Sequence, residues 1–138
     1  MPEDRPSKIY IAPYSKVLSN LSESLDQAGQ YKLTVTQLND CLKLLLRAVQ
    51  FDESWYLHEY PDVKAAVARG EFRSGKHHFA ESGYFEGRRL ASITVDEEWY
   101  SRAYPDVGQS LEFGELTSCQ EHFEQFGEEE GRIPFEDC

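Results

Sequence analysis

Apolar residues recur with a helical period in the first third of the chain. Residues 15–27 read SKVLSNLSESLDQ, and their valine and three leucines share one helix face. This pattern predicts a helix of about 12–14 residues, which Gly29 would end. Residues 1–13 contain three prolines and lack this period, so we expect a flexible arm before the helix.

A second and wider apolar stripe covers residues 34–50. Thr34 or Thr36 is placed to cap the start of this helix with its hydroxyl. A stripe this wide predicts burial on more than one side, against the rest of the chain or against the same helix of a second chain. We therefore expect residues 14–50 to form a helical hairpin with a partner-binding face. The predicted partner-binding positions on it are Leu38, Leu42, Leu45, Leu46 and Val49.

The rest of the chain contains one segment written twice. Residues 51–90 and 95–134 align without a gap at an offset of 44, and 17 of the 40 positions are identical. A period of this length indicates one supersecondary unit used twice and stacked on its copy. An element that is present twice is more often scaffold than active site.

Helix start and stop signals divide each copy into three short helices. In the first copy, Asp52 is placed to cap the first helix, and Pro61 suits the first turn of the second. Gly70 falls where a left-handed residue ends that helix, while Ser74 is placed to cap the third helix and Gly83 to end it. The second copy has the same residue types 44 positions later, and Ser118 to Glu121 has the spacing of a capping box.

No segment shows the sustained alternation of a β-strand. The sequence therefore predicts an all-α protein whose two three-helix repeats stack as a short solenoid-like bundle. Its expected parts are a flexible arm at 1–13, the N-terminal helical hairpin at 14–50, repeat 1 at 51–90, repeat 2 at 95–134 and a tail at 135–138.

Charge is distributed unevenly along the chain. The formal net charge is −11, and residues 91–138 carry 13 acidic and 2 basic side chains, whereas residues 1–90 carry 12 of each. Such a surface repels phosphate backbones and anionic membranes, which argues against nucleic-acid binding. It is either a solubilising surface or a docking face for a basic partner, which we place at Glu128 and Glu129.

Three cysteines, Cys41, Cys119 and Cys138, show no paired spacing. This argues against a disulfide framework or a zinc site and favours a reducing compartment. The sequence also has no apolar run of about 20 residues and no secretory signal at its start. We therefore expect a soluble, cytoplasmic protein.

Both copies share a set of residues at fixed spacing. In the first copy these are Asp52, Trp55, Tyr56, Tyr60, Pro61, Asp62, Val63, Gly70, His78, Phe79, Gly83, Glu86, Gly87 and Arg88. This set resembles a bacterial repeat module of the form FDxxWYLxxYPDVxxAxxxGxxxxxxHFxxxGxxEGRxP. The module accompanies glycosyltransferases and methyltransferases of surface-polysaccharide pathways, and some large secreted proteins. The resemblance covers both repeats but not residues 1–50. It implies a bacterial source and an accessory module without catalytic residues.

Histidines raise the question of a metal site. His78 and His122 occupy equivalent positions, and His77 is adjacent to the first. Zinc ligands converge within about 2.0–2.2 Å of the ion, whereas equivalent residues of stacked repeats lie one repeat apart. We favour imidazoles that pack inside a helix and hydrogen-bond a neighbouring backbone group, with a small His-based metal protein as the less favoured alternative. No cofactor is predicted.

Charged residues retained in both copies predict an ion pair that closes each unit. They are Asp62, Glu86 and Arg88, with equivalents 44 positions later. A carboxylate pair for acid–base catalysis is the alternative, but its duplication argues against it. We expect structural roles for Trp55, Tyr60, Asp62 and Arg88 in the first copy and for Trp99, Tyr104, Asp106 and Arg132 in the second.

The Trp-Tyr pairs of the two repeats have two interpretations. Their position just inside a capped helix favours core packing, whereas exposed rings would stack on sugars. We therefore expect a non-enzymatic interaction or scaffold protein that self-associates or binds a protein partner through its apolar N-terminal helix. A glycan-binding module that uses the repeat aromatics is the alternative.

Overall fold

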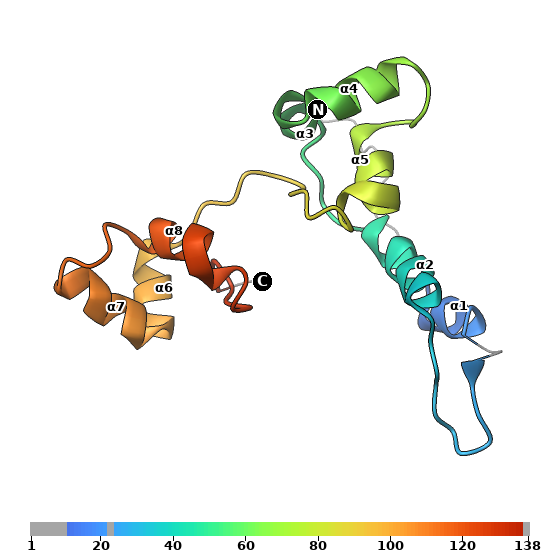
Figure 1. Ribbon diagram of the computed structural model, residues 1–138, viewed down its shortest axis with the longest axis horizontal. Helices are drawn as coiled ribbons and strands as arrows, with labels where there is room; N and C mark the ends of the chain where they lie inside the picture. Colours follow the sequence, from blue (N-terminus) through green and yellow to red (C-terminus); the bar gives the residue numbers. More distant parts are fainter. Residues whose placement is uncertain (1–10, 22–23, 137–138) are drawn as a thin grey trace, which may run out of the picture. The chain divides into compact units, whose positions relative to one another are not determined.

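The computed structural model describes residues 11–21 and 24–136, and it divides into two units (Figure 1). Unit 1 comprises Met1–Ala91 and unit 2 comprises Ser92–Cys138. The described residues form eight α-helices and two π-helical turns, with no β-strand among them. The predicted all-α class is confirmed. Most of the predicted arm and the last two residues of the tail lie outside the described residues.

The first helix is shorter than the sequence predicts. α1 spans Tyr14–Ser19, and none of its residues is buried, so no packing holds the polar residues that follow in a helix. The hydroxyl of Ser19 donates to the carbonyl of Lys16, because short polar side chains compete with the backbone ladder. Leu25, predicted on the helix face, instead forms an isolated antiparallel bridge with Tyr31.

The second helix, α2 (Val35–Leu46), begins where one of the two predicted caps lies. Thr34 accepts a hydrogen bond from the backbone of Gln37, and the Gln37 side chain accepts one from the backbone of Thr34. This reciprocal capping box fixes the first turn. Cys41 and Leu46 are the buried residues of α2.

Each repeat forms three α-helices, and the third continues as a π-helical turn. Repeat 1 contains α3 (Glu53–Glu59), α4 (Pro61–Ala68), α5 (Gly75–His78) and the turn η2 (Phe79–Gly83). Repeat 2 contains α6 (Glu97–Ala103), α7 (Pro105–Glu112), α8 (Cys119–His122) and η3 (Phe123–Gly127). The predicted caps at Asp52, Ser74 and their equivalents all accept the expected backbone hydrogen bonds.

The third helix ends where the sequence predicts, but its predicted capping box in repeat 2 does not form. The turn η2 ends at Gly83. The left-handed residue that follows is Gly87 (φ 76°), whose N–H donates to the carbonyl of Tyr84. The backbone N–H of Arg88 donates to the carbonyl of Gly83, which completes a Schellman motif. In repeat 2, the Glu121 side chain bonds the backbone N–H of Thr117 rather than that of the cap residue, so the capping box is incomplete.

Each unit has a hydrophobic core of its own. In unit 1 the buried cluster is Leu46, Tyr56, Val63, Phe79 and Ala80. In unit 2 it is Val95, Tyr100, Val107, Cys119 and Phe123. A backbone hydrogen bond joins the two ends of each repeat. The N–H of Asp52 donates to the carbonyl of Leu90, and the N–H of Asp96 donates to the carbonyl of Pro134. The stacking of one repeat on the other stays a prediction.

Candidate functional site

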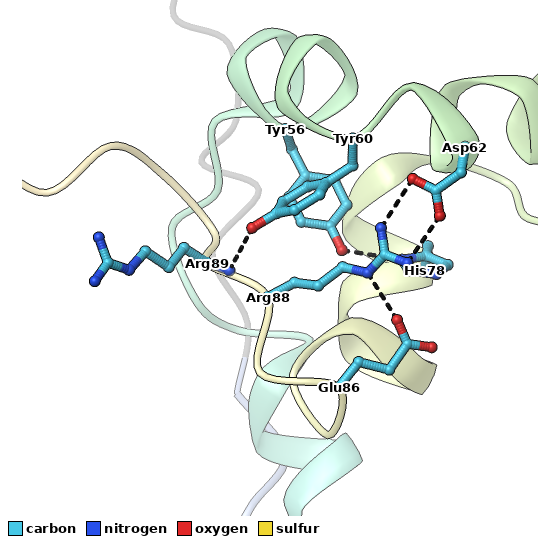
Figure 2. Close-up of polar contacts among 7 residues, drawn as sticks. All are labelled: Tyr56, Tyr60, Asp62, His78, Glu86, Arg88 and Arg89. Carbon is cyan, nitrogen blue, oxygen red and sulfur yellow. Dashed lines mark hydrogen bonds and ion pairs between the residues drawn. The ribbon is translucent and has the colours of Figure 1, made fainter. Parts of the chain in front are cut away.

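In unit 1 a buried tyrosine hydroxyl meets a buried histidine ring. Tyr56 lies one turn after the Asp52 cap on α3, and His78 is the last residue of α5. The hydroxyl of Tyr56 lies 2.9 Å from Nδ1 of His78, and the two side chains point toward each other (Figure 2). The predicted backbone partner of the histidine is therefore wrong, and a side chain of the first helix takes its place.

Arg88 forms the second part of the site. Its two terminal nitrogens donate to the two oxygens of Asp62 at 3.0 and 2.8 Å, and its Nε donates to Glu86 at 2.7 Å (Figure 2). The guanidinium lies 4.9 Å from the ring centroid of Tyr60, which allows a cation–π contact. Asp62 lies in the first turn of α4 and Arg88 follows the Gly87 turn, so the predicted closing ion pair is confirmed.

The same arrangement occurs in unit 2. We call the six side chains of each unit the closing network: Tyr56, Tyr60, Asp62, His78, Glu86 and Arg88 in unit 1, and their equivalents in unit 2. The contacts there are Tyr100–His122 (3.0 Å), Arg132–Asp106 (2.9 and 2.7 Å), Arg132–Glu130 (2.7 Å) and Arg132 over Tyr104 (4.8 Å).

Burial and charge shift the pKa values of three members of the closing network of unit 1. Burial raises the pKa of the Tyr56 hydroxyl far above its ordinary value. Burial, together with the nearby Arg88 charge, lowers the pKa of His78. The hydrogen bonds from Arg88 lower the pKa of Asp62. At neutral pH the tyrosine and histidine are therefore uncharged, and the aspartate and arginine form an ion pair.

A Tyr–His pair beside an Asp–Arg pair contains the groups that acid–base catalysis uses. However, three surface pockets of unit 1 are lined by other residues, not by the closing network. Every buried side-chain nitrogen and oxygen in the part of the chain that the structure describes has a hydrogen-bond partner. The arrangement is suited to holding three helices together.

The remaining histidine of interest has a local role. His77 accepts a hydrogen bond at Nδ1 from the backbone N–H of Arg73, 3.1 Å away. In repeat 2 the equivalent Glu121 accepts from the equivalent backbone N–H of Thr117. Across residues 11–21 and 24–136, no group of three or more histidine, cysteine, aspartate or glutamate side chains has the arrangement of a metal site.

The two tryptophans have equivalent surroundings. Trp55 and Trp99 are half-buried and pack against the core of their own unit. Each ring lies edge-on to a tyrosine, with centroids 6.2 Å apart for Trp55–Tyr60 and 6.1 Å apart for Trp99–Tyr104. The predicted core packing of these rings is confirmed. Glycan binding by the repeat aromatics stays a prediction.

The predicted partner-binding residues divide into two groups. Leu46 is buried in the core of unit 1, and Val49 packs partly buried against it, because the end of α2 contacts η2. The prediction that Leu46 binds a partner is therefore wrong. Leu38 and Leu45 are 47% and 39% exposed, and Leu42 is half-buried. In unit 2, Glu128 and Glu129 are exposed.

A carboxylate that the sequence analysis missed holds the third helix of each unit. Glu53 accepts hydrogen bonds from the backbone N–H groups of Gly75 (2.6 Å) and Lys76 (3.0 Å) at the start of α5. Glu97 does the same for Cys119 and Gln120 at the start of α8. The sequence contained a signal for this role, because the glutamate is identical in both copies.

Comparison with known proteins found no matching family model, no matching curated protein and no matching solved structure. Function is therefore inferred from the residues themselves. Over the described residues, no helix combines the length and the apolar character needed to cross a membrane.

Proposed function

We propose that this chain is a non-enzymatic interaction protein whose α2 helix associates with α2 of a second copy. The observation that carries this proposal is the exposure of large apolar side chains on α2. Val35 is 75% exposed, Leu38 47% and Leu45 39%. Their burial against another helix would remove this apolar surface from water, which favours association.

The spacing of these positions supports a helical partner. Val35, Leu38, Leu42 and Leu45 are separated by three, four and three residues, the alternation found where two helices pack along a seam. At 3.6 residues per turn, they project between the buried Cys41 and Leu46. The edges of the apolar stripe are therefore covered, and its middle is open.

The closing networks support a scaffold role for the repeats. In both units the side chains with catalytic potential are engaged in hydrogen bonds or ion pairs with one another. Unit 2 carries the acidic excess of the chain, and we propose that its exposed Glu129 belongs to a docking face for a basic partner.

The proposed setting is the cytoplasm of a bacterium, in the company of surface-polysaccharide enzymes. The resemblance of both repeats to the bacterial module supports the source and the pathway. The free, buried thiols of Cys41 and Cys119 suit a reducing compartment. Burial raises the pKa of Cys119 to about 12, which keeps this thiol protonated and unreactive.

Size-exclusion chromatography with light scattering tests the self-association. We expect a dimer at micromolar concentration and a monomer for the double variant Leu38→Gln/Leu45→Gln. Phe113→Gln is the matched control, because Phe113 is 77% exposed but lies in unit 2, and it should leave the dimer intact. A wild-type chain that stays monomeric at high micromolar concentration would contradict the proposal.

A further inference from the structure

We propose that unit 1 carries a binding pocket for a phosphate group, either free phosphate or the phosphate end of a small ester. The inference is independent of the proposed function. A surface pocket of about 190 Å³ is lined by residues that follow α2, residues at the start of α5 and residues of η2. Its polar lining residues are Arg47, Arg73, Ser74, Lys76, His77 and Glu81.

Hydrogen-bond donors dominate this lining. Arg73 and Lys76 have no carboxylate partner for their side chains among the residues that the structure describes. Because Nδ1 of His77 accepts from the Arg73 backbone, its Nε2 carries the hydrogen and is a donor. The Oγ of Ser74 accepts from the His77 backbone, which leaves its hydroxyl hydrogen free to donate.

The single carboxylate of the pocket is already neutralised. Glu81 lies 3.4 Å from Lys43 and 3.9 Å from Arg47. The pocket also does not rely on the backbone N–H groups that begin α5, because Glu53 takes those of Gly75 and Lys76. The attraction for an anion therefore comes from the lining side chains that follow α2 and that lie at the start of α5.

The second repeat provides a natural comparison. Where repeat 1 has Arg73, Lys76 and His77, repeat 2 has Thr117, Gln120 and Glu121 on a backbone with the same cap and the same helix. Three cationic or donor side chains are thus replaced by two neutral ones and an acid. The closing network, by contrast, has identical residues in both copies, and the buried tyrosine, valine and phenylalanine of the core recur as well. The basic lining is therefore not needed for the fold of the unit.

The number of donors favours phosphate over a carboxylate. A carboxylate offers two oxygens, whereas a phosphate group offers three or four around a tetrahedral centre. The two arginines, the lysine, the histidine and the serine together offer more donors than a carboxylate accepts. A pocket of about 190 Å³ exceeds the roughly 30 Å³ of one water several times over, so it has room for such a group.

Nuclear magnetic resonance of the ¹⁵N-labelled full chain tests this site. Sodium phosphate and glycerol phosphate are titrated separately at constant ionic strength, with sodium chloride as the reference. We expect saturable shifts of the backbone amides of residues 73–81, with a dissociation constant on the order of 1 mM. The equivalent amides at 117–125 should not shift. Binding of both compounds would identify a site for a terminal phosphate, and binding of inorganic phosphate alone a site for the free ion.

The variant Arg73→Thr/Lys76→Gln/His77→Glu introduces the residues that repeat 2 already tolerates at these positions. We expect it to weaken phosphate binding at least about ten-fold and to keep the wild-type spectrum elsewhere. Lys76→Gln alone should weaken phosphate binding by a smaller factor. This single variant tests the site if the triple variant does not fold. Equal shifts with chloride, shifts in repeat 2 of the same size, or unchanged affinity of the variants would overturn the proposal.

Discussion

The hydroxyl of Tyr56 lies where a side chain at Gly83 would begin. A Cβ built on Gly83 overlaps that oxygen and lies 3.3 Å from Nδ1 of His78. Tyr100 and Gly127 stand in the same relation in unit 2. The glycine is therefore present in both copies because a tyrosine hydroxyl approaches the backbone, not because the chain turns there.

Gly83→Ala should destabilise unit 1 by about 1–3 kcal/mol. The new methyl group displaces a hydroxyl that is held by the buried His78 ring, so the conflict cannot be relieved by a simple rotation. Urea unfolding followed by circular dichroism measures the change. Ser82→Ala, one residue earlier and half-buried, is the matched control and should change the unfolding free energy by less than about 0.5 kcal/mol.

Tyr56→Phe separates this steric explanation from a general effect of alanine. It removes the atom that the new methyl group meets, so Tyr56→Phe/Gly83→Ala should be more stable than the two single changes added together. Strict additivity in the double-mutant cycle would mean that the hydroxyl is not the obstacle.

Arg88→Gln should lower the free energy of unfolding by about 0.5–1 kcal/mol. The variant loses the paired contact with Asp62 and the packing over Tyr60, but Asp62 is 62% exposed, so the ion pair is screened by solvent. Thermal unfolding gives the measurement. Arg69→Gln removes a pair in which both side chains are more than half exposed, and it should leave the melting temperature unchanged. If both variants lowered the melting temperature equally, the Arg88 ion pair would stabilise the unit no more than an ordinary surface ion pair does.

Acid should weaken unit 1 through Asp62. Its pKa is lower in the folded chain than in the unfolded chain, so the unfolded state binds more protons as the pH falls. The stabilisation is complete above the ordinary aspartate value of about 3.9, and it is lost as the pH falls from there through the lower pKa of the folded chain. Unfolding midpoints from about pH 5 to about pH 2.5 should fall less steeply for Asp62→Asn than for the wild type. Parallel curves would exclude this contribution.

The repetition made most of the local structure predictable. Local hydrogen bonding predicts the caps at Asp52 and Ser74, and backbone sterics predict the left-handed Gly70. Each of these residues has an equivalent 44 positions later. The Arg88–Asp62 pair was predictable because both residues recur with their spacing intact. The caps, the left-handed glycine and the ion pair were therefore recovered from sequence, whereas the recurring contacts of Glu53 and of Tyr56 with His78 were not.

The details that escaped prediction depend on three-dimensional contacts. Gly83 ends the helical turn as predicted, but its close contact with the hydroxyl of Tyr56, which is 27 positions away in sequence, was not predictable. The predicted first helix stops at Ser19 because no tertiary packing supports its continuation. The wide stripe predicts burial on more than one side, but it does not tell which of its leucines packs inside the chain; Leu46 does, because η2 contacts the end of α2.

His78 should make the stability of unit 1 depend on pH near neutrality. Its pKa is lowered in the folded chain, so the unfolded chain takes up the proton first as the pH falls below about 6.5. The stabilisation is present above that value and is lost toward lower pH, by at most about 1.4 kcal/mol per pH unit. Urea midpoints at about pH 7.5 and about pH 5.5 should differ more for the wild type than for His78→Gln. If the midpoint shifted equally with pH in the wild type and in His78→Gln, the pH dependence would come from a group other than His78.

Separate cores predict separate unfolding of the two units. Val63 and Val107 occupy equivalent positions, each is 1% exposed, and each belongs to the buried cluster of its own unit. Val63→Ala should cost about 1–3 kcal/mol through the lost methyl groups and the cavity. Hydrogen exchange measured by mass spectrometry should then speed up in α3, α4 and α5 but not in α6, α7 and α8. Val107→Ala should give the reverse pattern. If either variant loosened both units equally, the two repeats would unfold as one cooperative body, as a stacked solenoid does.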